Sequence, residues 1–170
     1  MVNRWCAFRN DKVSIINKIP LIPPIKFDED STPSFDAAFT CRRVSYFDHF
    51  LSVEENCDYV YYELAKRSNA LASYYVAEDR LMYLWSFFAG QGKNFTIRSG
   101  RICELGDLED TIKLGKEVMR EIDGYSVCFD GAGVIWEPAY DLTHLLWLPK
   151  GASWTTVEKS VGASGLYLLD

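Results

Sequence analysis

The groups that could supply a nucleophile and a base are few in this chain of 170 residues. Cys128 and His144 fall on predicted strands, and the strand that carries His144 is the next but one after that of Cys128. A thiolate nucleophile needs a nearby base of this kind to lower its pKa. Buried, inert cysteine is the commoner state, so a small hydrolase built on Cys128 and His144 is the alternative rather than the main hypothesis.

Carboxylates are the second set of groups that could do chemistry. The run Asp28-Glu29-Asp30 offers oxygen ligands that Mg²⁺ or Ca²⁺ accepts, as in a nuclease-like metal site. Its spacing lacks the glycine and the terminal glutamate of a calcium loop, and an acidic run beside prolines favours a solvated turn. The glycines in residues 90–93 and 131–133 also lack the spacing of nucleotide-binding loops. We therefore predict no catalytic residue, no metal and no cofactor.

An acidic and aromatic segment, residues 27–63, is the most distinctive part of the sequence. It carries nine acids against two bases, with eight aromatic residues interleaved from Phe35 to Tyr62. Aromatic side chains give rigid contact area, and clustered acids attract basic partners. The residues predicted to bind a protein partner lie in its second half: Asp48, Glu54, Glu55, Asp58, Tyr59, Tyr62 and Glu63.

The totals are those of a folded, acidic, globular protein. Hydrophobic residues make up 48% and charged residues 25% of the chain, and the net charge is −6. These values fit one domain with a sizeable core. An acidic protein without a basic stripe is not expected to bind nucleic acid or an anionic membrane. Residues 1–26 carry five bases against one acid, so the alternative is that this segment docks on the acidic segment within the molecule.

The cysteines and the N-terminus indicate the compartment. An odd number of cysteines, five, with no close pair argues against a disulfide framework and against CxxC zinc or redox chemistry. Residues 1–12 hold no apolar run, so we expect no signal peptide. Free thiols in a reducing cytoplasm fit these features best.

The elements that must position these residues follow from periodicity and turn signals. Ser52 and Glu55 form a capping box ahead of apolar residues at helical spacing, which predicts a helix over residues 52–75 with a break near 68–69. Residues 78–89 favour a helix that ends at Gly90, and Asp107 caps another over residues 108–122. The apolar face of this second helix is expected at Leu108, Ile112, Gly115, Met119 and Ile122, which step by four, three, four and three. Strands are predicted at residues 95–98, 101–105, 125–129, 134–137, 143–148 and 166–169.

This order of elements predicts an α+β fold in a single domain, residues 1–170. Its sheet is mainly antiparallel and comes from C-terminal hairpins, with two or three helices packed on one face. Residues 1–33 are predicted to be an extended N-terminal segment. The prolines at positions 20, 23, 24 and 33 forbid a helix or a central strand there.

In size, acidity and lack of catalytic motifs the chain resembles the immunity proteins that bacteria make against secreted toxin domains. Those proteins are typically acidic inhibitors that block basic nucleases or other toxins. The resemblance is one of overall properties, and it implies a cytoplasmic inhibitor that binds a basic protein. An inhibitor of a host defence enzyme encoded by a phage and a structural subunit of an assembly are the other non-enzymatic alternatives.

Overall fold

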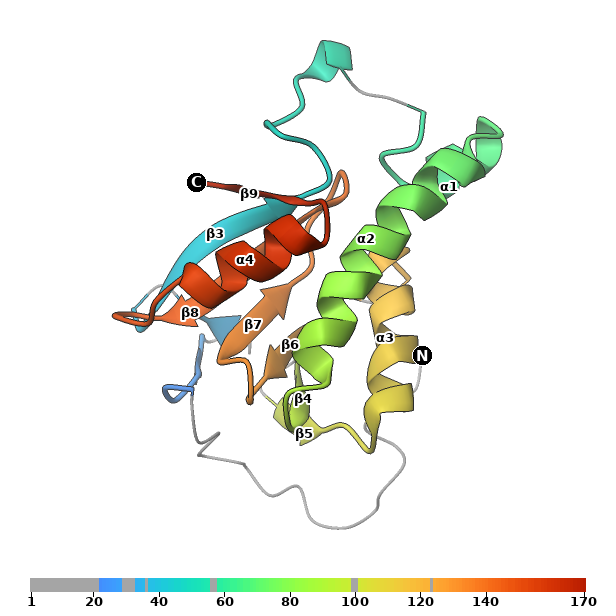
Figure 1. Cartoon of the computed structure of the whole chain (residues 1–170). Helices are drawn as coiled ribbons and strands as arrows, with labels where there is room; N and C mark the ends of the chain where they lie inside the picture. The colour runs from blue at the N-terminus through green and yellow to red at the C-terminus, as the bar shows by residue number, and fades with distance from the viewer. Residues whose placement is uncertain (1–21, 29–32, 36, 56–57, 99–100, 123) are drawn as a thin grey trace.

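The computed structural model describes residues 22–28, 33–35, 37–55, 58–98, 101–122 and 124–170. Within them, helices pack on one face of a mainly antiparallel sheet, which confirms the predicted α+β class (Figure 1). The helical elements are η1 (Val53–Glu55), α1 (Tyr62–Arg67), α2 (Leu71–Ala89), α3 (Leu108–Met119) and α4 (Thr155–Ala163). Among these helices none combines the length and the apolar character that crossing a bilayer requires.

The main sheet has seven strands in the order β5-β4-β6-β7-β8-β3-β9, and each neighbouring pair is antiparallel. Its strands are β3 (Phe39–Ser45), β4 (Asn94–Arg98), β5 (Arg101–Glu104), β6 (Ser126–Phe129), β7 (Val134–Glu137), β8 (Thr143–Pro149) and β9 (Tyr167–Leu169). A separate pair is formed by β1 (Lys26–Phe27) and β2 (Pro33–Ser34). The sheet is therefore largely C-terminal, but β3, which comes from the first third of the chain, lies between β8 and β9.

The helix-covered face of the sheet is packed around Trp85 of α2. Its ring lies 5.0 Å from that of Phe129 and 5.3 Å from that of Trp136, and its Nε1 donates to the carbonyl oxygen of Thr111 at 3.0 Å. A Cβ atom at Gly115 of α3 would lie only 2.7 Å from Trp85 Nε1. The absence of a side chain at Gly115 thus permits the close approach of α3 to α2.

A buried ion pair also joins α2 to the end of α3. Glu78, whose side chain is 5% exposed, accepts two hydrogen bonds from the Arg120 guanidinium, at 2.7 and 2.8 Å. The hydroxyl of Tyr74 donates to the carbonyl oxygen of Met119 at 2.6 Å. This bidentate pairing with Arg120 offsets part of the cost of burying the Glu78 carboxylate.

The opposite face of the sheet is covered in part by the segment that precedes β3. Ile22 and Phe35 are buried there, and the Phe35 ring lies 5.3 Å from that of Trp147. The sheet residues in this second cluster include Phe95, Ile97, Cys128 and Ile135. The described part of the N-terminal segment therefore packs on the sheet, and residues 1–21 lie outside the described part.

The predicted helix over residues 52–75 is wrong in its first half, and the second half is helical. η1 ends at Glu55, Tyr61 has extended backbone (φ −122°, ψ 145°), and α1 begins only at Tyr62. The expected break near residues 68–69 is confirmed, since α1 ends at Arg67 and Asn69 adopts a φ of +57°. The run from Tyr59 to Tyr62 is aromatic and β-branched, and such residues prefer extended backbone, so the capping signal at Ser52 yields a single turn.

The helix after Asp107 is confirmed, but its length and its buried face differ from the prediction. The Asp107 carboxylate accepts the N–H of Asp110 at 2.8 Å, and α3 ends at Met119. Leu108 and Ile122 were expected on the buried face, yet they are 51% and 67% exposed. The buried positions are Thr111, Leu114, Gly115, Val118 and Met119.

Candidate partner-binding site

The acidic loop that follows β3 starts from a fixed point in the core. Ser45, the last residue of β3, is fully buried. Its hydroxyl oxygen accepts the N–H of Phe47 at 3.1 Å and the hydroxyl of Thr143 at 2.9 Å. The N–H of Tyr46 donates to the carbonyl oxygen of Leu142 at 3.2 Å. These bonds tie the beginning of the loop to the start of β8.

Three aromatic rings hold the two halves of the loop together. The ring of Tyr46 lies 5.3 Å from that of Phe47 and 6.5 Å from that of Tyr59, and Phe47 and Tyr59 are 6.3 Å apart. The Arg80 guanidinium of α2 lies 5.1 Å from the centre of the Tyr46 ring. Tyr59, which was predicted to contact a partner, is therefore half-buried as part of this internal cluster.

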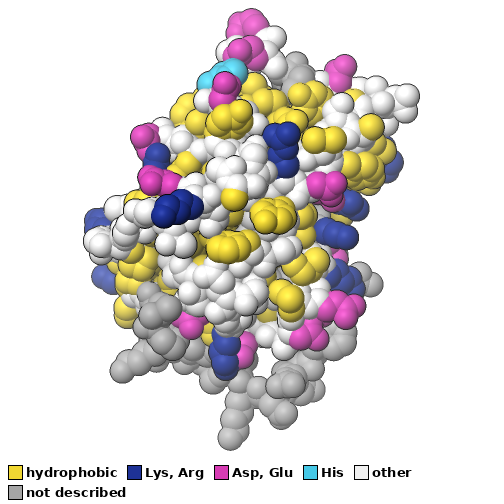
Figure 2. Space-filling model, viewed as in Figure 1, with side chains coloured by type: hydrophobic (Ala, Val, Ile, Leu, Met, Phe, Trp, Pro, Cys, Tyr) yellow, Lys and Arg dark blue, Asp and Glu magenta, His cyan; other side chains and the backbone are white. Residues whose placement is uncertain are grey.

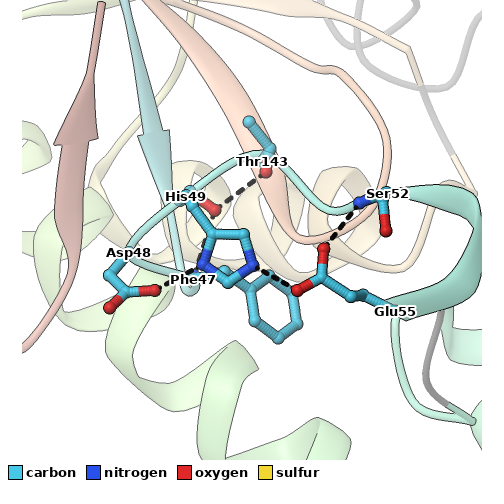
Figure 3. Close-up of polar contacts among 7 residues, drawn as sticks. Phe47, Asp48, His49, Ser52, Glu55 and Thr143 are labelled. Carbon is cyan, nitrogen blue, oxygen red and sulfur yellow. Dashed lines mark hydrogen bonds and ion pairs between the residues drawn. The ribbon is translucent and has the colours of Figure 1, made fainter.

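His49 bridges two of the predicted site residues (Figure 3). Its Nδ1 lies 2.6 Å from Asp48 Oδ1, and its Nε2 lies 3.1 Å from Glu55 Oε1. The other oxygen of Glu55 accepts the N–H of Ser52 at 3.0 Å, which is half of the predicted capping box. We call Asp48, His49 and Glu55 the His49 bridge; it connects the loop after β3 with η1.

The hydrogen bonds of the bridge change the acidity of its members. The bond to Asp48, followed by the bond to Glu55, raises the pKa of His49 above its usual value of 6.5. The backbone N–H of Ser52 makes the largest contribution to lowering the pKa of Glu55, and His49 adds to it. Both shifts favour the charged forms, a cationic imidazolium and an anionic carboxylate.

The acidic side chains of this region face solvent. Residues 46–63 contain five acids and neither Lys nor Arg. All five acids are exposed: Asp48, Glu54, Glu55, Asp58 and Glu63. Figure 2 shows acidic side chains and a histidine together at the top of the molecule, above the sheet and helices. Within the described part of the chain, the side chains of Glu54 and Asp58 take part in no hydrogen bond or ion pair.

Phe50 supplies an exposed aromatic surface beside these acids. Its side chain is 52% exposed, and the Arg43 guanidinium of β3 lies 5.2 Å from the ring centre. Sequence reasoning assigned neither Phe50 nor His49 to the site. The available signal was their position, because both follow Asp48 directly inside the acidic segment.

Two predicted site residues belong to a different environment. Tyr62 and Glu63 lie in the first turn of α1, where the Tyr62 ring packs 5.4 Å from that of Tyr74 and 5.0 Å from the Arg120 guanidinium. Glu63 Oε1 lies 3.9 Å from Lys66 Nζ. The structure thus unites Asp48 and Glu55 through His49, whereas Tyr62 is an internal contact of the helix layer.

Cys128 and His144 do not form a catalytic pair. Cys128 lies in the cluster with Phe95 and Ile135, on the face covered by the N-terminal segment. His144 lies on the other face, 5.2 Å from the ring of Trp136. Burial raises the pKa of the Cys128 thiol far above its usual range and lowers the pKa of His144 to about 3. A protonated thiol and a neutral imidazole on opposite sides of a sheet cannot exchange a proton.

The acidic turn shows no metal-binding arrangement in the part of the chain that the structure describes. Asp28 is exposed, and Glu29 and Asp30 lie outside the described residues. No group of three or more His, Cys, Asp or Glu side chains in the described ranges converges as metal ligands would.

Comparison with known proteins gives no matching family model, no significantly similar curated protein and no significantly similar solved structure.

Proposed function

We propose that this protein is a cytoplasmic, acidic inhibitor of a basic protein, of the type of a bacterial toxin-neutralising immunity protein. One observation carries the proposal. The loop between β3 and α1 exposes Asp48, Glu54, Glu55 and Asp58, and residues 46–63 hold no Lys or Arg. Such a concentration of one sign of charge accelerates the encounter with an oppositely charged partner.

The loop also has the features that turn an encounter into a complex. Phe50 is an exposed aromatic side chain among the acids, and aromatic anchors carry much of the energy of protein interfaces. Ser45 and the ring cluster of Tyr46, Phe47 and Tyr59 hold the two ends of the loop in place before any partner arrives. A surface that is ordered in advance loses little conformational entropy on binding.

The alternative of a small hydrolase or nuclease-like enzyme has no observation of this kind in its support. Cys128 and His144 lie on opposite faces of the sheet. The acidic run at residues 28–30 has only Asp28 in the described part of the chain. We therefore retain one proposed function.

A growth assay tests the proposal directly. The product of the reading frame beside this gene would be expressed from an inducible promoter, with and without this protein. We expect the neighbouring product to arrest growth and the wild-type protein to restore it. Glu54→Lys with Asp58→Lys should abolish the rescue, because the pair reverses two exposed charges without removing a described contact.

The matched control is Asp79→Lys with Glu109→Lys, which reverses two exposed acids on α2 and α3. The control should rescue growth fully. Binding of the purified proteins, followed at low and high salt, should weaken about tenfold or more for the loop variant and little for the control. A neighbouring product that does not arrest growth, or rescue that survives the loop reversal, would refute the proposal.

A further inference from the structure

Both ring nitrogens of His49 lie within hydrogen-bond distance of carboxylate oxygens, and this geometry requires a protonated ring. A neutral imidazole has one N–H donor and one lone pair, whereas imidazolium has two donors. The contacts to Asp48 at 2.6 Å and to Glu55 at 3.1 Å come from opposite sides of the ring. Only imidazolium can donate to both, since the neutral ring would aim a lone pair at an oxygen.

His49 is the one residue in the sequence between β3 and α1 whose side chain can carry a positive charge near neutral pH. Asp48 of its own loop and Glu55 of η1 face it directly. Two cationic side chains of elements next to the loop contact aromatic rings, Arg43 of β3 that of Phe50 and Arg80 of α2 that of Tyr46. With Glu54 and Asp58, the loop between β3 and α1 therefore carries four negative charges, and a protonated His49 reduces the sum to −3.

We propose that His49 is an internal, titratable counter-cation of the binding loop. In the free protein the imidazolium pairs with Asp48 and Glu55, as a Lys or Arg side chain of the partner would. When such a side chain binds, it displaces the imidazolium from both carboxylates. The partner contact at this point is then a basic side chain that inserts between the two carboxylates. This inference rests on the proposed function for the identity of the partner, but the His49 bridge is a property of this chain alone.

The exchange of one cation for another couples binding to pH. A partner cation that displaces His49 removes the two carboxylates that keep the imidazole protonated. Binding should therefore release a proton from His49. As the pH falls from the raised pKa of free His49 toward the usual value of 6.5 expected in the complex, the affinity should fall by up to about tenfold per pH unit. Above the raised pKa the affinity should be constant.

Proton NMR of the two histidines tests the bridge without any partner. His144 is fully buried with a pKa of about 3 and should be silent between pH 5 and pH 9, so the one titrating ring is His49. We expect it to titrate above 6.5, and Asp48→Asn and Glu55→Gln should each lower its pKa. The matched control Glu54→Gln removes a neighbouring charge that forms no bond to the ring, and it should leave the pKa nearly unchanged. Titration at or below 6.5, or equal effects of all three variants, would overturn the proposal.

Octalysine is the probe for the displacement step, added at constant ionic strength. We expect the pKa of His49 to fall toward 6.5 as the peptide binds, and octaglutamate to have no such effect. A His49 pKa that octalysine leaves unchanged would overturn the counter-cation role. Because neither measurement uses a toxin, failed growth rescue with a responsive His49 would refute the proposed function alone. Successful rescue with an indifferent His49 would refute this inference alone.

Discussion

At the scale of single residues, the packing of α3 on α2 depends on Gly115. A Cβ at this position would lie 2.7 Å from Nε1 and 2.8 Å from Cε2 of the fully buried Trp85 ring. We expect Gly115→Ala to lower the free energy of unfolding by about 1–3 kcal/mol through overpacking. Thermal unfolding followed by circular dichroism should show a drop in Tm of about 2–4 °C for each kcal/mol.

Gly162 of α4 provides the control for this substitution. It is an exposed helical residue, and a Cβ there would have no atom within 4 Å. Gly162→Ala should raise the free energy of unfolding by about 0.5–1 kcal/mol, because alanine loses less backbone entropy in a helix. Equal effects of the two substitutions would show that the contact with Trp85 is not tight.

The exposure of the acids in the candidate site could be predicted from single residues, but the His49 bridge could not. Charged side chains such as Glu54 and Asp58 are seldom buried, so their place on the surface follows from residue type. The contact between His49 and Glu55 spans six residues. It depends on how tightly the chain turns between them, and neither residue carries a local signal for that turn.

At the scale of elements, the Glu78–Arg120 pair connects α2 to the end of α3. Because Glu78 is buried, Arg120→Gln would leave its carboxylate without a cation. We expect a loss of about 3 kcal/mol in the free energy of unfolding, measured by denaturant titration. Glu78→Gln combined with Arg120→Gln should recover part of this loss, since no unpaired charge then remains. A double variant no more stable than Arg120→Gln would contradict this role of the pair.

Elements with local signals could be predicted, and those that depend on tertiary contacts could not. The hairpins of β4 with β5 and β6 with β7 were marked by turn residues, and α3 by its cap at Asp107. β3 was missed because Arg42 and Arg43 at its centre break the alternation of a half-buried strand. α4 was missed because it buries only Val157 and Val161 and is rich in threonine, valine and glycine.

At the scale of the whole molecule, burial of His144 makes stability depend on pH. The folded pKa of His144 is about 3, below its usual value of 6.5, so the unfolded chain binds one more proton between these values. The contribution of neutral His144 is present above pH 6.5 and is lost as the pH falls. We expect the free energy of unfolding to decrease by up to about 1.4 kcal/mol per pH unit from pH 6.5 to pH 5.

His144→Asn isolates this contribution, because its side-chain oxygen replaces Nδ1 as the acceptor of the Ala139 N–H. The variant should lose the slope that wild type shows between pH 5 and pH 6.5. His49 does not interfere in this window, since its pKa is raised and its stabilising contribution is lost only as the pH rises above 6.5. Identical slopes for wild type and variant would show that another group sets the pH dependence.

The place of β3 in the sheet has a consequence for the order of events during protein synthesis. Phe39 of β3 pairs with Pro149 of β8, and Arg43 of β3 pairs with Leu169 of β9. In both pairs the two residues are more than a hundred positions apart in the sequence. A ribosome needs about 5–20 s to add a hundred residues. During that interval the β4–β5 and β6–β7 hairpins can form, while β3, the strand that precedes the acidic loop, has neither of its partner strands. The acidic loop that follows β3 would therefore be among the last parts of the nascent chain to reach its final structure.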